Sequence, residues 1–241
     1  MAIAAFLAMT AAEIRSNPVF PHKCGWMACH FSPYGTALSN LPEALPPGSL
    51  LILNDRIPWQ GHDPDRIAAQ LQEVTESLSC HGLLLDFQRP GCPEAARLCE
   101  TLSRQLPCPV GVSALYAEGL SGPVFLPPVP VQVTLKNYRA PWHGRELWLE
   151  LALNAEEILL TAEGSATAPL PFSESTEKGY REEQLHCRYR LQLSEDSARF
   201  LLRRTREDLD ALLEAAEPLG VTTAVGLWQE LGSYVPCSGG S

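Results

Sequence analysis

The sequence predicts an α/β fold built on a parallel sheet. Short, almost wholly apolar stretches alternate with segments of helical periodicity, as where "GSLLILNDRIP" (48–58) is followed by "DRIAAQLQEVTESL" (65–78). Strands that alternate with helices of this length form right-handed βαβ units and a parallel sheet covered on both faces. A chain of 241 residues, 45% of them hydrophobic, has the ordinary length of one α/β barrel domain with one large core. We therefore expect a single domain over residues 1–241.

The first half of the chain repeats the strand and helix pattern regularly. Asp63 can cap the helix over 65–78, with Pro64 in its first turn and apolar residues at helical spacing behind it. The next strand is "GLLLDFQRP" (82–90), followed by the helical segment 93–106 and the strand "PVGVSALYA" (109–117). Upstream, the first strand comes from either "IAAFLAM" (3–9) or "GWMACHF" (25–31).

The pattern is less regular in the second half. Prolines in "GPVFLPPVPVQVTL" (122–135) predict a short strand, and "RELWLELAL" (145–153) predicts a strand with leucines on one face and Glu146, Trp148 and Glu150 on the other. We expect a small antiparallel insertion at about 155–192, formed by "EEILLTAEG" and "LHCRYRLQL". A helix over 194–220 and a last strand in "VTTAVGLWQELG" (221–232) complete the chain.

Charge and composition argue against several classes of partner. The formal net charge is −10 and the isoelectric point is about 5.1, so a nucleic acid or an anionic membrane would be repelled. The apolar run at the start has no basic segment before it, and Glu13 and Arg15 interrupt it before it reaches a spanning length. We read this run as a buried helix or strand and expect a cytoplasmic protein.

The eight cysteines are expected to be free, structural thiols. No close pair has the C-x₂-C spacing that brings two thiolates to one zinc ion. Cys92 and Cys99 fall on one face of a predicted helix, where burial explains them as well as metal binding does. The sequence therefore predicts no metal and no cofactor, and reduced thiols agree with the cytoplasm.

Two segments resemble glycoside hydrolase family 18, the chitinase-like barrels, in particular the compact forms found with spore and cell-wall proteins. The family signature D-G-x-D-x-D-x-E on the fourth barrel strand aligns with "HGLLLDFQ" (81–88), in which Gly82 and Asp86 match. The closing helix and "LGVTTAVGLWQELG" (219–232) resemble the family's last helix and strand, with Trp228 at the tryptophan that floors the sugar site. The departures are His81 and Leu84 in place of aspartates and Gln88 in place of the catalytic glutamate.

The resemblance implies a compact TIM barrel of the (β/α)₈ type, with irregularity or a missing strand left open, and a site at its C-terminal mouth. In the family, the glutamate protonates the leaving oxygen while the aspartate orients the substrate's acetamido group. An amide has no acidic proton to give, and general acid catalysis is typically worth about 10²–10⁴-fold in rate. We therefore take Asp86 and Gln88 as the catalytic positions of a degenerate site.

Further residues are expected to line the same mouth and bind a ligand. Each has an alternative role: core packing for the tryptophan, loop capping for the residues after the strand at 48–58, and surface or ion-paired positions for the glutamates. The candidates are Trp228, Asn54, Asp55, Tyr34, Tyr116, Glu150 and Glu230, the last two also as replacement acids. Asp86 itself could be a structural carboxylate bonded to loop amides or to Arg89.

Three functions remain open at this stage. The first is a catalytically degenerate barrel that binds a carbohydrate or a related small molecule. The second is an active glycosidase that uses Asp86 with Glu150 or Glu230, and the third is a scaffold that only binds protein partners. A mouth filled with leucine side chains would favour the scaffold, whereas an open acidic cleft would favour the glycosidase. The oligomeric state and the ligand are left open.

Overall fold

The computed structural model of the chain describes residues 2–17, 23–34, 37–171 and 179–232. Within them, eight parallel strands close into a barrel, because the last strand, β14 (Val221–Leu227), pairs with the first, β1 (Ala4–Met9). The strands between them are, in barrel order, β2 (Cys24–Phe31), β4 (Leu50–Asn54), β5 (Gly82–Asp86), β6 (Val110–Ser113), β7 (Val124–Leu126) and β8 (Leu147–Leu151). The predicted fold class is confirmed, and both apolar segments near the start supply barrel strands.

Helices cover this barrel unevenly. The longer ones are α2 (Pro64–Ser77), α3 (Pro93–Gln105) and α5 (Arg206–Ala216), and the shorter ones are α1 (Ala11–Ser16), α4 (Leu135–Arg139) and α6 (Trp228–Leu231). Residues 114–123, all described, connect β6 to β7 without a helix. Short 3₁₀ turns follow α4 at Ala140–Trp142 and α5 at Glu217–Leu219, and the two-residue strand β3 (Leu38–Ser39) pairs antiparallel with β2. The barrel is therefore complete in strands but irregular in helices.

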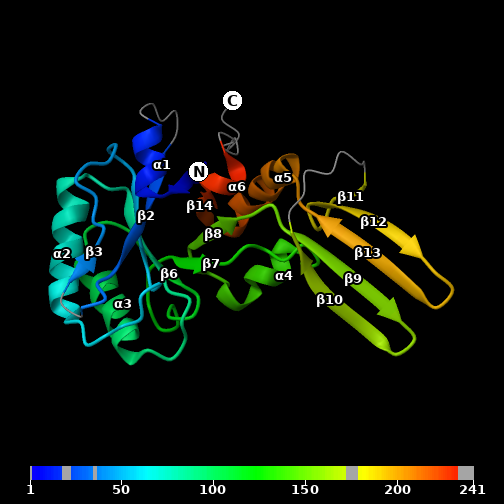
Figure 1. Cartoon of the computed structure of the whole chain (residues 1–241), viewed down its shortest axis with the longest axis horizontal. Coiled ribbons are helices and arrows are strands. Elements are labelled where there is room, and N and C mark those ends of the chain that lie inside the picture. Colours follow the sequence, from blue (N-terminus) through cyan, green and yellow to red (C-terminus); the bar gives the residue numbers. More distant parts are fainter. Residues whose placement is uncertain (1, 18–22, 35–36, 172–178, 233–241) are drawn as a thin grey trace.

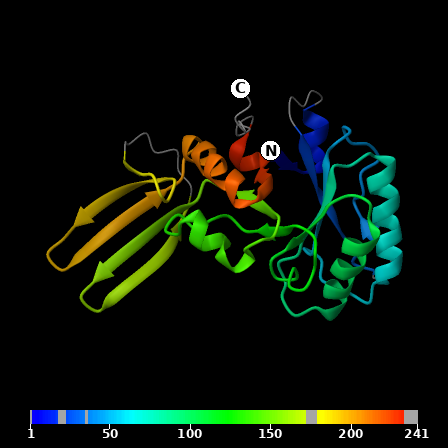
Figure 2. The same ribbon diagram turned by 180° about the vertical axis from the view of Figure 1, so that it is seen from behind.

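The helix after β4 forms as its sequence predicts. Asp63 caps α2 by accepting a hydrogen bond from the backbone N–H of Asp65, and Pro64 occupies the first turn. Its apolar stripe, including Ile67 and Leu71, is buried against the strands. α2 and α3 lie on the side of the barrel that faces away from the antiparallel strands between residues 155 and 203 (Figures 1 and 2).

The barrel interior is a packed apolar core. Alternate residues point inward, so that Leu50 and Ile52 of β4 fill the interior while Leu51 and Leu53 pack against the helices. Further interior side chains are Phe6, Ala8, Leu84, Phe125, Trp148 and Val225.

The indole of Trp148 needs space that two glycines supply. A Cβ at Gly111 would lie 2.2 Å from the Trp148 ring, and one at Gly82 would lie 3.1 Å from it and 2.7 Å from the carbonyl oxygen of Pro109. The glycine that matches the family signature is thus required here by packing.

A second, antiparallel sheet, which we call the insertion sheet, lies between β8 and α5. Its strands are β9 (Ala155–Thr161), β10 (Gly164–Leu170), β11 (Tyr180–Glu182), β12 (Cys187–Leu193) and β13 (Ser197–Arg203), in the spatial order β10-β9-β13-β12-β11. It projects from one side of the barrel (Figure 1). The expected antiparallel insertion before the last helix and strand is confirmed.

Two predicted boundaries in this half of the chain are wrong. The segment 194–220 was expected to be helical throughout, but Ser197–Arg203 is strand β13 and the helix begins only at Arg206, after the capping box of Thr205 and Asp208. Ala198, Phe200 and Leu202 alternate along β13, and pairing with both β9 and β12 stabilises the strand. The last strand ends at Leu227, where α6 begins.

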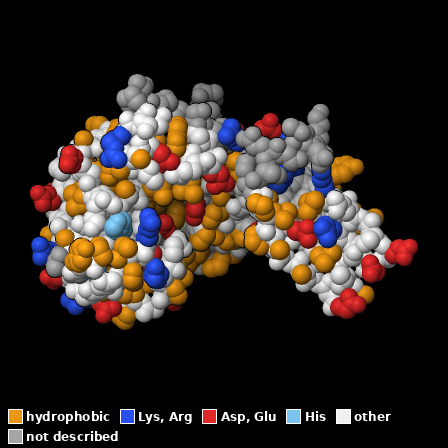
Figure 3. Space-filling model, in the orientation of Figure 1, with side chains coloured by type: hydrophobic (Ala, Val, Ile, Leu, Met, Phe, Trp, Pro, Cys, Tyr) orange, Lys and Arg blue, Asp and Glu red, His pale blue; other side chains and the backbone are white. Residues whose placement is uncertain are grey.

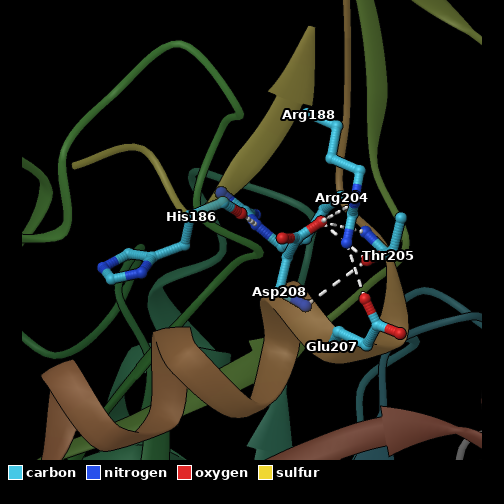
Figure 4. Close-up of polar contacts among 6 residues, drawn as sticks. All are labelled: His186, Arg188, Arg204, Thr205, Glu207 and Asp208. Atoms are coloured by element: carbon cyan, nitrogen blue, oxygen red, sulfur yellow. Dashed lines mark hydrogen bonds and ion pairs between the residues drawn. The ribbon is translucent and has the colours of Figure 1, made fainter. Parts of the chain in front are cut away.

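Arg204 attaches the insertion sheet to the barrel (Figure 4). Its buried guanidinium donates hydrogen bonds to the carbonyl oxygens of Val129, Leu185 and His186, at 2.6, 3.2 and 3.1 Å. Its backbone N–H donates to the carbonyl of Asn154 at 2.8 Å, so the two chain segments that enter and leave the sheet are joined. The fork of donors on one arginine thereby connects the loop after β7 to the base of the insertion sheet.

Candidate functional site

The carboxyl ends of the barrel strands meet at one mouth, and acidic side chains gather there. Asp86 ends β5, Glu150 lies one residue before the end of β8, and Glu230 lies in α6 just after β14. Because all barrel strands are parallel, Asn54 at the end of β4 and Trp228 after β14 belong to the same end of the barrel. This is the end at which barrel proteins build their active sites.

A small cavity opens at the centre of this mouth. Its volume is about 40 Å³, which holds a few water molecules but not a sugar ring. Asp86 and Glu150 contribute its two carboxyl groups. The rest of its lining is Ala8, Met27, Ile52, Leu84, Phe125, Val225, Gly226 and Leu227. The mouth is thus partly filled with apolar side chains and keeps an acidic rim.

Asp86 and Gln88 are in direct contact. The side-chain amide of Gln88 donates a hydrogen bond to Oδ1 of Asp86. Burial raises the pKa of Asp86, the hydrogen bond from Gln88 lowers it, and the negative charge of Asp55 raises it further. The amide therefore satisfies one oxygen of the carboxylate, and Gln88 itself has no acidic proton to donate.

Glu150 has the most perturbed carboxyl group of the mouth. Burial, together with the negative charges of Asp86 and Glu230, raises its pKa to about 7. The carboxyl is then about half protonated at neutral pH, the condition in which an acid can both give and take a proton. The negative charge of Glu150 in turn adds to the burial that raises the pKa of Tyr138 to about 12.

A larger groove lies beside the cavity, between the barrel and the insertion sheet. It has a volume of about 500 Å³, within the range of small-molecule sites. Glu230 and Glu156 are its acidic residues, and the remaining lining is Pro128, Pro130, Ala152, Leu153, Asn154, Ala155, Pro169 and Leu170. Glu230 accepts a hydrogen bond from the backbone N–H of Leu153, which ties α6 to the end of β8. Figure 3 shows one face of the molecule, with a hollow between the barrel and the insertion sheet.

Three of the expected ligand residues are already engaged in holding loops. Asp55 is buried and accepts hydrogen bonds from the backbone N–H groups of Gln88 and Arg89, at 3.0 and 2.8 Å. Asn54 donates to the carbonyls of residues 27 and 29, where the register of β2 shifts. Tyr116 donates to the carbonyl of Arg89 and packs edge-on against a buried phenylalanine. Asp55 and Tyr116 thus position the loop after β5, and Asn54 holds the irregular part of β2.

The two remaining candidates lie away from the cavity. The side chain of Tyr34 is 86% exposed, in the loop after β2. Trp228 is half-buried and packs against the core between strands and helices, while Leu227, one residue earlier, points into the barrel. Met27, Phe125 and Leu227 were not identified from the sequence as lining residues. The period-two alternation from Val225 would have placed Leu227 inside.

Within the part of the chain that the structure describes, no group of three or more metal-ligating side chains could hold a metal ion, and the seven described cysteines are free. None of the described helices is long and apolar enough to cross a membrane. Cys237 lies outside the described residues.

Solved structures of low sequence identity share this fold, although no protein-family model and no curated protein sequence matches the chain. The spore cortex-lytic enzyme SleL of Bacillus cereus gives a TM-score of 0.54 at 8% identity, over 97% of this chain and 72% of that one. A chitinase from Chromobacterium violaceum gives 0.54 at 10% identity, over 97% and 96%. A GH18 chitinase from Cycas revoluta in complex with (GlcNAc)3 gives 0.52 at 9%, over 92% and 94%. The chain therefore has the fold of these enzymes, and its chemistry must be argued from its own residues.

Proposed function

We propose that this chain binds a carbohydrate at the C-terminal mouth of its barrel and does not hydrolyse it by the family 18 mechanism. The observation that carries the proposal is the pair at the end of β5, in which the amide of Gln88 hydrogen-bonds to the carboxylate of Asp86. The fold shared with chitinases and with SleL supports a carbohydrate as the ligand class.

The size of the two spaces supports a binding mode across the mouth. A sugar ring cannot enter the central cavity of about 40 Å³, whereas the adjoining groove of about 500 Å³ has room for one or two rings. Glu230 lines the groove and acts electrostatically on Glu150, which lines the cavity, so the two spaces adjoin. Carboxylates and the amide of Asn154 supply acceptors and donors for sugar hydroxyls.

Gln88 limits what the site can catalyse. Its side-chain amide can donate and accept hydrogen bonds but has no acidic proton, so the step that protonates a glycosidic oxygen has no donor at this position. The two other signature positions carry His81 and Leu84. Leu84 is buried in the barrel interior and supplies no charge to the site.

A second candidate function is a glycosidase with a relocated acid. The specific observation in its favour is Glu150, whose pKa of about 7 would let it act as a general acid beside Asp86. In this variant of the proposal, Glu150 protonates the leaving oxygen and Asp86 stays ionised.

Isothermal titration calorimetry with (GlcNAc)3 tests the proposal. We expect native protein to bind (GlcNAc)3. Asp86→Asn and Glu230→Gln should each weaken binding at least about tenfold, because each variant loses one hydrogen-bonded acceptor and tenfold corresponds to about 1.4 kcal/mol. Glu163→Gln, an exposed change in the turn after β9, is the matched control and should bind like native protein. Failure of native protein to bind (GlcNAc)3 or any member of a glycan array would overturn the proposal.

Hydrolysis of a chromogenic chitobioside separates the two candidates. We expect no turnover by native protein. Turnover of about 1 s⁻¹ or more that Glu150→Gln abolishes would instead establish the relocated-acid glycosidase.

A further inference from the structure

The insertion sheet has one apolar face that the other described elements leave uncovered along most of its length. The register of β9, β13 and β12 places Ile158, Phe200 and Leu191 side by side on this face. Because strand side chains alternate, the other members of the face follow at steps of two. The apolar ones are Leu160, Ala198, Leu202, Tyr180, Tyr189, Leu193 and Cys187, β10 adds Ser165, Thr167 and Pro169, and Glu156 and Glu182 lie at the base.

Exposure on this face increases with distance from the barrel. Leu202 and Cys187, at the base, are buried against Val131 from the loop after β7. Toward the outer end, Leu191 is 43% exposed and Leu193 is 75% exposed. Four of the six large hydrophobic side chains that are exposed among the described residues belong to this one face. Clustering of this kind marks an interaction surface, whereas single exposed apolar residues do not.

The opposite face of the same sheet is more polar. It carries Arg199 and Glu157, which form an ion pair at 3.3 Å, and the exposed side chain of Gln192. The half-buried Leu159 and Leu201 also lie on it. A sheet with one polar and one apolar face is stable when the apolar face is buried against another layer. The described residues supply no second layer over the outer part of this apolar face.

We propose that a second copy of this chain supplies the missing layer, so that two insertion sheets pack face to face about a twofold axis. Such an interface is isologous, since the same face serves both copies. Two antiparallel sheets pack in this way about 10 Å apart in sandwiches.

The available area suits a weak dimer. Strands β9, β10, β12 and β13 have seven residues each, so the face measures roughly 19 Å by 24 Å, or about 450 Å². Two faces bury at most about 900 Å², about three quarters of the roughly 1,200 Å² at which standard stable interfaces begin. We therefore expect a weak, concentration-dependent dimer.

The chemistry of the face favours a protein layer over a glycan. Three of its four exposed large side chains are leucines, which offer neither a flat ring for stacking on a sugar nor a hydrogen bond to a hydroxyl, and the fourth is Tyr180. Charged residues on this face are confined to its base, where Glu156 and Glu182 lie.

Sedimentation velocity of the full chain between about 1 and 300 µM tests the proposal. We expect the mass to rise from 26.4 kDa toward twice that value with concentration. The single variants Leu191→Lys and Leu193→Lys should each stay monomeric at every concentration. Gln192→Lys is the matched control, because it adds the same charge between these two positions on the polar face, and it should dimerise like native protein.

Two outcomes would overturn the proposal. One is a native chain that remains monomeric at 300 µM. A monomer of this kind that also adsorbs to an insoluble polysaccharide through this face would show that the face binds a glycan instead. The other is dimerisation of Leu191→Lys and Leu193→Lys with the native constant. Both leucines are exposed in the single chain, so thermal unfolding of these variants should match that of Gln192→Lys and exclude misfolding as the cause.

Discussion

Replacing Glu150 with glutamine should stabilise the protein at neutral and alkaline pH. Burial and the charges of Asp86 and Glu230 raise the pKa of this carboxyl from the ordinary 4.5 to about 7. A rise of about 2.5 in pKa corresponds to about 3 kcal/mol, at about 1.4 kcal/mol for each pKa unit. This is the free energy that a charged Glu150 costs the folded state.

The sign of the effect follows from proton binding. Between pH 4.5 and about 7 the folded protein keeps the proton of Glu150 and the unfolded chain releases it. The contribution of Glu150 to the free energy of unfolding therefore falls as the pH rises through this window, and it is constant above it. Glutamine cannot ionise, so Glu150→Gln lacks this fall.

Urea unfolding at pH 4.5, 6, 7 and 8 measures the difference between variant and native protein. We expect it to grow by up to about 3 kcal/mol across the series in favour of Glu150→Gln. Glu163→Gln, at an exposed turn, should show no such trend. A difference that stays constant within about 0.5 kcal/mol would refute the assignment of a buried, charge-crowded carboxyl at this position.

The remaining predictions concern catalysis, packing and oxidation state. Gln88→Glu should raise chitobioside hydrolysis less than about tenfold, because the signature aspartates are missing, and a gain near the 10²–10⁴-fold of a working acid would contradict this. Asp55→Asn should cost about 1–3 kcal/mol of stability, since it leaves one of two loop N–H groups without an acceptor, whereas the exposed Asp65→Asn should cost less than about 0.5. Gly111→Ala should cost at least about 1–3 kcal/mol by clashing with Trp148, and Trp148→Leu in the same chain should recover part of it. Thiol titration in denaturant without reductant should count close to the eight cysteines of the sequence, and a count near zero would show disulfides.

The structure gives the signature glycine a physical role apart from catalysis. Gly82 and Gly111 lie on neighbouring strands, and both make room for the ring of Trp148 in the barrel interior. Their lack of a side chain is thus explained by the core alone. The site at the mouth, in contrast, depends on Asp86, Gln88 and Glu150, at the carboxyl ends of β5 and β8.

The sequence alone was sufficient for most of the barrel strands and for the helices that follow two of them, but it did not show that both apolar segments near the start are strands. Apolar runs such as Leu50–Asn54 and Gly82–Asp86 and the cap at Asp63 are local signals, because they depend on residues within one or two turns of the chain. The resemblance of 81–88 and 219–232 predicted the fold that the solved chitinases share at 8–10% identity. The sequence also placed Asp86 at a strand end, where barrel sites form.

Only the tertiary structure decided which polar side chains face the mouth and which hold loops. Asp55 reads as a site residue in the sequence, yet its carboxylate accepts two backbone N–H groups 33 and 34 residues away. Trp228 lies outside the barrel core and Leu227 inside, because the strand ends one residue before the tryptophan. Strand β13 was mistaken for helix, since its stability comes from pairing with β9 and β12. The raised pKa of Glu150 likewise arises from burial and from the charges of Asp86 and Glu230, which are distant in sequence. The order of residues along the chain does not show which charges will lie near one another.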